Sequence, residues 1–279
     1  IHPAARRLLP WFLRRGISAN AVSLAGLALG TAAALAYALA DVQPRPNGGT
    51  WLGYTLGTIG ALLIVWLMWF GVRKRQYANE TGNLRGWVSA HIYLGLALSV
   101  VATLHTGFQI GWNIHSLAYV LTMATIGTGV WGLSFYLRYP TEMSNVLNRQ
   151  SPEQIVGQIQ TLDREAQKLL KNTTDMVTRI VNASLNQHIF STRRNQRKGT
   201  VKDCATEKAV HSLQQEMTRI DGLSDIYGNQ VQRLRALKQL RRYYHMRYWL
   251  ELWLSFHVPL SFGLLAALIA HVLSVFIYW

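Results

Sequence analysis

The sequence predicts an all-α membrane protein with five transmembrane helices and a large polar, helical insertion before the last of them. Three observations lead to this fold class: long runs without charged residues, tryptophans at the ends of those runs, and charges that are segregated along the chain. Hydrophobic residues make up 50% of the 279 residues, yet the mean hydropathy is only +0.10. The mean therefore averages a very apolar part of the chain with a very polar one.

The apolar runs are long enough to cross a bilayer, which takes about 20 residues in a helix. Five stretches meet this length: Ala19–Ala40, Trp51–Val72, Trp87–Ile110, His115–Leu137 and Trp249–Tyr278. Tryptophans stand at their ends, as in an interfacial aromatic belt: Trp51, Trp87, Trp112, Trp249 and Trp279. The alternative is a soluble bundle of five buried helices. It would need amphipathic helices to cover them, and none lie near the first four runs.

The positions of lysine and arginine predict the orientation. The chain has 28 of them against 13 acidic residues, a formal net charge of +15 that would ordinarily suggest a nucleic-acid partner. All but Arg45 lie before the first span, between the second and third spans, or within 138–247. The positive-inside rule places these parts in the cytoplasm and the C-terminus outside. The charge therefore indicates topology, and we expect no nucleic acid.

The chain accordingly divides into five parts. We expect a basic cytoplasmic segment 1–18, a first span at 19–40, three spans within 51–138, a cytoplasmic insertion at 139–247 and a last span at 248–279. The expected location is the bacterial inner (cytoplasmic) membrane. Cys204 is the only cysteine, which excludes a disulfide scaffold and a cysteine-ligated zinc or iron–sulfur centre. The sequence starts at Ile1 and not at a methionine, which leaves open whether residues precede it.

The insertion 139–247 has apolar residues at helical spacing, including Ile155 and Ile159. Ser151 is predicted to cap a helix that has Pro152 at its first position. A basic loop is expected at Ser191–Thr200, where a solvated surface and a dock for anionic lipid or an acidic partner are both open. A last helix is predicted to run without a breaker into the final span. The simplest prediction is a coiled-coil-like hairpin of two antiparallel helices.

Four of the nine histidines lie deep inside predicted spans, where ionisable residues are uncommon and mark candidate functional sites. His91 and His105 lie on the third span, and His257 and His271 lie on the fifth. Both pairs are 14 residues apart, so each span presents two imidazoles on nearly one face, about 21 Å apart. The third and fifth spans run in the same direction. We therefore expect His91 to face His257 on the inner side, and His105 to face His271 on the outer side.

Two imidazoles from facing helices are the axial ligands of a six-coordinate haem iron. The stripe between the histidines of the third span is smooth and includes Gly95, and glycines on the neighbouring spans leave room for flat macrocycles. Glycines of this kind also serve ordinary close helix packing. A zinc site is less compatible with this spacing, because two ligands to one zinc ion on a helix lie three or four residues apart and not fourteen. A proton relay usually recruits aspartate or glutamate, which these spans lack near the histidines.

The spacing of these histidines makes the chain resemble the transmembrane dihaem b-type cytochromes. Cytochrome b of the bc complexes has two histidines with 13 residues between them on each of two helices, as His91/His105 and His257/His271 have here. The ferric reductase and NADPH oxidase group is similar in placing ligands on its third and fifth helices. The resemblance implies two haem b groups held within a four-helix bundle of spans two to five. The insertion 139–247 belongs to neither pattern, and no flavin or nicotinamide domain follows the last span.

With both axial positions filled by histidine, we expect electron transfer and not substrate chemistry. The predicted function is an electron-transfer subunit that works between partner redox proteins or a quinone pool, in a membrane complex of several different subunits. Arg73 and Arg85, with Arg75 and Arg247, are candidate partners of the inner haem propionates, but arginines near the inner face are more often a topology signal. Polar candidates on the outer side are Arg45, Trp112, Asn113, His115 and Ser116, but His115 and His245 are expected to have surface roles. The alternative is a non-enzymatic membrane scaffold organised by the cytoplasmic hairpin.

Overall fold

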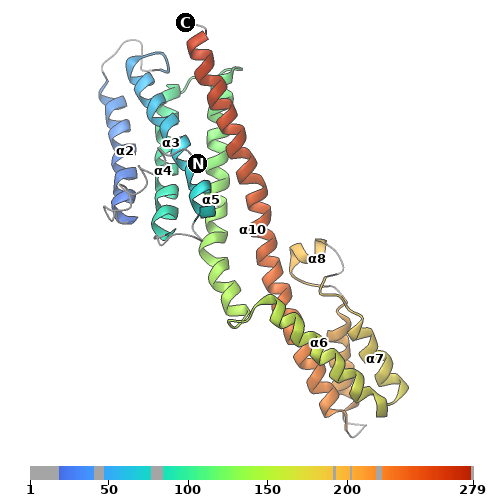
Figure 1. Ribbon diagram of the computed structural model, residues 1–279. Coiled ribbons are helices and arrows are strands. Elements are labelled where there is room, and N and C mark those ends of the chain that lie inside the picture. The colour runs from blue at the N-terminus through green and yellow to red at the C-terminus, as the bar shows by residue number, and fades with distance from the viewer. Residues whose placement is uncertain are drawn as a thin grey trace. The chain divides into compact units, whose positions relative to one another are not determined.

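The computed structural model describes residues 19–40, 47–76, 84–190, 193–201, 203–217 and 222–277. Within these residues all regular structure is helical (Figure 1). The elements are α2 (Ala19–Leu39), α3 (Trp51–Gln76), α4 (Leu84–Thr106), α5 (Ile114–Val146), α6 (Pro152–Leu169), the 3₁₀ turn η2 (Leu170–Asn172), α7 (Asp175–Leu185), α8 (Arg193–Lys198), α9 (Ala205–Glu216) and α10 (Ser224–Ile277). The predicted all-α class is thus confirmed.

Four helices of the described chain, namely α3, α4, α5 and α10, are long and apolar enough to cross a membrane. The first predicted span is α2, whose apolar stretch Leu24–Leu39 is shorter than the other four. The fifth span therefore stays a prediction. The basic segment 1–18 lies outside the described residues.

Apolar side chains on the outside of these helices agree with the membrane prediction. Leu62 of α3 is 66% exposed and Phe262 of α10 is 59% exposed, and many other leucines, valines and isoleucines of these helices are exposed as well. A water-soluble protein rarely exposes so much contiguous apolar surface. In a bilayer the same side chains lie against lipid tails, and helices satisfy their own backbone hydrogen bonds there.

The chain forms two compact units, Ile1–Trp131 with Ser255–Trp279, and Gly132–Leu254. Helices α5 and α10 each continue from one unit into the other. The continuous α10 confirms the prediction that the last helix of the insertion runs into the final span. Helix α5 extends past Leu137 through Pro140 to Val146, so the fourth helix is longer than expected.

The core of the first unit joins all of its described helices. Helix α4 packs against α2 and α3, where the buried side chains are Ala33, Leu52, Leu56 and Val101. A second buried cluster joins α3, α4 and α10 through Ile64, Leu98 and Leu264, with Leu121 of α5 packed against it. These clusters hold α4 in the middle of the unit.

The second unit corrects the expected two-helix hairpin. Between α5 and α10 the described chain forms α6, η2, α7, α8 and α9, and the expected loop Ser191–Thr200 contains the short helix α8. The 3₁₀ turn η2 ends at Thr173. The backbone of Thr173 is extended, and its hydroxyl donates a hydrogen bond to the Leu170 carbonyl. The physical reason is burial of apolar side chains. Each short helix has one apolar face, and this face is covered when the helices fold back and pack on one another, which one long helix would not allow.

Two buried clusters hold the helices of this unit together. The first joins Leu147, Ile155 and Ile159 to Leu237 and Leu240 of α10. The second joins α6, α7, α9 and the start of α10 through Ala166, Val177, Val181, Leu213, Leu223 and Ile226. The predicted start of α6 is confirmed, since Ser151 caps the helix in a capping box with Gln154 and Pro152 opens it.

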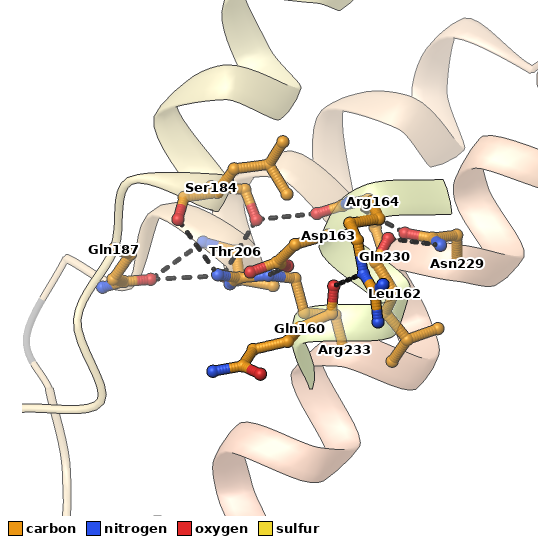
Figure 2. Close-up of polar contacts among 11 residues, drawn as sticks. Gln160, Leu162, Asp163, Arg164, Ser184, Gln187, Thr206, Asn229, Gln230 and Arg233 are labelled. Atoms are coloured by element: carbon orange, nitrogen blue, oxygen red, sulfur yellow. Dashed lines mark hydrogen bonds and ion pairs between the residues drawn. The ribbon is translucent and has the colours of Figure 1, made fainter. Parts of the chain in front are cut away.

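A buried polar network links the same helices (Figure 2). Arg233 of α10 is 1% exposed and donates from Nε to Asp163 Oδ1 at 2.7 Å and from Nη1 to Thr206 Oγ1 at 2.7 Å. Ser184 of α7 donates to Gln230 Oε1 at 2.6 Å. A buried charge is tolerated only when it is paired and hydrogen-bonded, as Arg233 is here.

Candidate functional site

His105 and His271 lie together in the first unit. His105 is on the last turn of α4 and His271 is near the end of α10. Their ring centres are 6.0 Å apart with the planes at 89°. Two imidazoles that bind one metal ion from opposite sides, each through a bond of about 2 Å, have ring centres about 6 Å apart. The spacing of this pair would therefore suit two imidazoles that hold one metal ion between them.

The first turn of α3 holds the ring of His105. Thr50 caps this helix by accepting the Gly53 N–H at 3.1 Å, and the Gly53 carbonyl oxygen lies 2.8 Å from His105 Nδ1. A Cβ atom on Gly57 would come within 2.7 Å of His105 Cε1, so a larger residue there would displace the ring. With its proton on Nδ1, the ring donates to Gly53 and leaves Nε2 unprotonated.

His271 has a different partner, which the sequence did not reveal. Its Nδ1 atom is hydrogen-bonded to Nδ1 of His115, and the two ring centres are 4.6 Å apart. His115 is exposed, as expected for a surface residue, and in addition its ring contacts His271. A signal was present: His115 opens α5 a few residues after His105 ends α4, so both lie at the same end of the helices.

His257 is held by α5. Thr128 donates its hydroxyl proton to the Thr125 carbonyl at 2.8 Å, and its Oγ1 atom lies 2.9 Å from His257 Nδ1. Because the Thr128 hydroxyl is already a donor, His257 donates from Nδ1 and Thr128 accepts. A Cβ atom on Gly129 would lie 3.4 Å from His257 Cε1, so the ring packs closely on the α5 backbone.

His91 lies on α4 and belongs, with His257, to the predicted inner pair. Its ring packs on Phe70 of α3, with centres 4.9 Å apart. Its Nδ1 atom is buried and has no hydrogen-bond partner among the described residues. Buried polar atoms are nearly always satisfied, so an unpaired imidazole nitrogen marks a candidate ligand.

An apolar layer separates the two histidine pairs. Leu98, at 2% exposure, and Leu264, at 4%, lie midway between the histidines of their own helices and share a buried cluster with Ile64. Fourteen residues of helix correspond to about 21 Å, so the pairs lie about that far apart along each helix. The arrangement is two polar layers with a dry layer between them.

The remaining predicted site residues are placed as follows. A Cβ atom on Gly95 would meet nothing within 4 Å, so the α4 backbone has open space beside it between the two histidines. Arg73 lies on α3 and Arg85 on α4, but their side chains, like all of Arg45, lie outside the described residues. Arg247 pairs with Glu251 at 2.7 Å, and His245 contacts the Gln196 carbonyl at 3.4 Å.

The chemistry of these residues is compatible with ligands to a bis-histidine haem, most directly at the His105/His271 pair. The supporting observations are the 6.0 Å spacing of one pair, the unpaired Nδ1 of His91 and the open backbone at Gly95. Within the described chain, no group of three or more His, Cys, Asp or Glu side chains is arranged to hold a metal ion. A bis-histidine haem needs only two such side chains, because the macrocycle supplies the other ligands.

Comparison of the chain with protein families, curated proteins and solved structures finds no match.

Proposed function

We propose that this protein is a membrane electron-transfer subunit with two haem b groups, one between His91 and His257 and one between His105 and His271. The observation that carries the proposal is the pairing of His105 with His271 at 6.0 Å, on two helices that each repeat histidine after 14 residues. A ligand repeat of this kind on parallel helices creates two sites and not one.

The protein's own contribution is to orient the rings. Gly53 accepts from Nδ1 of His105, and Thr128 accepts from Nδ1 of His257, so both rings are held from behind. Such partners fix the tautomer and raise the basicity of a ligating imidazole. A haem with two histidine ligands supplies a one-electron carrier without an open coordination site, which suits electron transfer. The layer around Leu98 and Leu264 keeps water from the space between the two sites.

In this proposal α2 is a fifth span, and spans two to five surround the haems. The distribution of lysine and arginine supports a cytoplasmic location for 139–247 and for the N-terminal segment, in a bacterial inner membrane. The 91/257 site then lies toward the cytoplasm and the 105/271 site toward the outside. Electrons enter and leave through partner proteins or a quinone, so the subunit works in a complex of several different subunits within membrane lipid.

A scaffold role is the second candidate, and the second unit favours it. The segment Gly132–Leu254 has its own apolar clusters and a buried network around Arg233, so it offers a defined surface to a partner. The two functions make opposite predictions for the histidines. Replacing His91, His105, His257 and His271 together leaves a scaffold able to assemble with its partners.

The deciding experiment is spectroscopic. The full chain, purified in detergent, is expected to show a reduced b-type spectrum with about two haems per chain. His91→Ala and His105→Ala are each expected to remove one haem, whereas His211→Ala on the exposed face of α9 is the matched control and retains both. A folded preparation that binds no haem when haem is supplied would overturn the proposal.

A further inference from the structure

We propose that His115 is a positioning residue for His271: it accepts a hydrogen bond from His271 Nδ1 and so turns His271 Nε2 toward His105. This inference rests on the proposed function, because it concerns how one haem ligand is held. The observations are the Nδ1 to Nδ1 hydrogen bond and ring centres 4.6 Å apart at 88°.

The residues around His115 fix the start of its helix. Asn113 caps α5 by accepting the Ser116 N–H at 2.9 Å, and the Ser116 hydroxyl accepts the Gly111 N–H at 2.9 Å. Ser116 itself is buried at 9% exposure. These two bonds close the connection between α4 and α5, so the first turn of α5 and the His115 side chain are held beside α10.

The direction of the bond follows from the chemistry of imidazole. A neutral imidazole has one N–H and one unprotonated nitrogen. If His271 binds iron through Nε2, its proton is on Nδ1, so His271 donates and Nδ1 of His115 accepts. His115 then carries its own proton on Nε2. The same arrangement leaves Nε2 of both His105 and His271 without a hydrogen-bond partner in the described part of the chain.

His115 makes the 105/271 site different from the 91/257 site. His105 donates to a carbonyl and His257 donates to a hydroxyl, whereas His271 donates to an imidazole nitrogen. An imidazole nitrogen is a stronger base than either oxygen, so it draws the His271 proton further and makes that ring the better electron donor. A better donor stabilises ferric over ferrous iron, and the midpoint potential of this haem is lowered.

The test compares His115→Leu with His115→Asn in the full chain, by potentiometric titration of the two haems. His115→Leu removes the acceptor. The substitution is expected to weaken binding of the 105/271 haem about tenfold. It is also expected to raise the midpoint potential of that haem by about 59 mV, which corresponds to a tenfold smaller preference of the site for ferric over ferrous haem. His115→Asn keeps an oxygen acceptor near the position of Nδ1, so it is expected to restore most of the haem affinity but only part of the lowering of the potential, because an amide oxygen is a weaker base than an imidazole nitrogen. The 91/257 haem serves as the internal control and keeps its potential.

Two outcomes overturn the inference and can be told apart. If the wild-type chain holds two haems and His115→Leu changes neither potential nor affinity, His115 does not position His271 while the proposed function stands. If the wild-type chain binds no haem, the proposed function fails and this inference fails with it. Imidazole ¹⁵N spectra of His271 give a second readout, because loss of the fixed Nδ1–H tautomer in His115→Leu is visible without reference to the iron.

Discussion

Leu98 of α4 and Leu264 of α10 belong to one buried cluster, and each lies midway between two histidines of its own helix. The two helices are therefore in register at this level, and beyond these leucines His105 meets His271. This relationship connects a pattern in the sequence to two sites in space.

We expect Gly57→Ala to disrupt the 105/271 site. The new Cβ would lie 2.7 Å from Cε1 and 3.0 Å from Nδ1 of His105, so the ring has to leave the Gly53 carbonyl. The haem content and reduced spectrum should match those of His105→Ala. Gly60→Ala is the matched control, because its Cβ would find atoms only at 3.8 Å. Alanine stabilises a helix by about 1 kcal/mol relative to glycine. A loss of haem that occurs in Gly57→Ala but not in Gly60→Ala is therefore due to displacement of the His105 ring and not to a weaker helix.

We expect Thr128→Val to weaken the 91/257 site. The substitution keeps the shape of the side chain and removes the oxygen that accepts from His257 Nδ1 at 2.9 Å. Loss of such a partner lowers metal-site affinity by about 10- to 100-fold, which haem titration of the purified protein would measure. Thr122→Val is the control on the same helix, since that hydroxyl bonds only to the Ala118 carbonyl. Equal affinities in the two variants would contradict the role assigned to Thr128.

We expect Arg233→Met to lower the free energy of unfolding of the second unit by about 3 kcal/mol, which is at the lower end of the range for breaking a buried ion pair. The lower end applies because Asp163, which is left without its partner, is partly exposed and can be hydrated. Hydrogen exchange of α7 and α9 amides in the full chain would report the change. Lys238→Met removes an ion pair from the same helix, but there both side chains are more than half exposed. That variant should change stability by less than about 1 kcal/mol. If the two variants behaved alike, the network around Arg233 would not hold the unit together.

The start of α6 should depend on pH. The pKa of Glu153 lies below its usual value, because its own backbone N–H and then the Ser151 hydroxyl bond the ionised carboxylate. A lowered pKa means that the stabilisation is complete above the unfolded value of about 4.3 and is lost as the pH falls through the folded value. Protection of the first α6 amides should fall over that acidic range. Glu153→Gln should abolish the dependence, and Glu165→Gln, in a later turn, should retain it.

Local features could be predicted from the sequence because neighbouring residues determine them. The long apolar helices, the cap at Ser151 and the continuous helix into the last span are of this kind. Features that depend on what covers an amphipathic face were missed. The predicted hairpin is one case, since helical periodicity shows that a segment is helical but not where it folds back on its neighbours.

His115 shows the same division at the candidate site. Its position at the start of a span predicted a surface residue, and His115 is indeed exposed, but only the structure shows that its ring is hydrogen-bonded to His271. The placement depends on the connection closed by Asn113 and Ser116, and on α10 lying beside α5 at that level. Residue spacing along one helix cannot predict this contact, because His115 and His271 lie on different helices that are brought together only by the tertiary structure.

By itself the sequence determined an all-helical chain with spans of membrane length and two equal histidine repeats, because composition, helical period and spacing are properties of single segments. Only the tertiary structure decided which ring nitrogen meets which partner: His105 with Gly53, His257 with Thr128 and His271 with His115. The physical reason is that hydrogen bonds between helices require positions within a few tenths of an ångström, and packing of the buried clusters sets those positions.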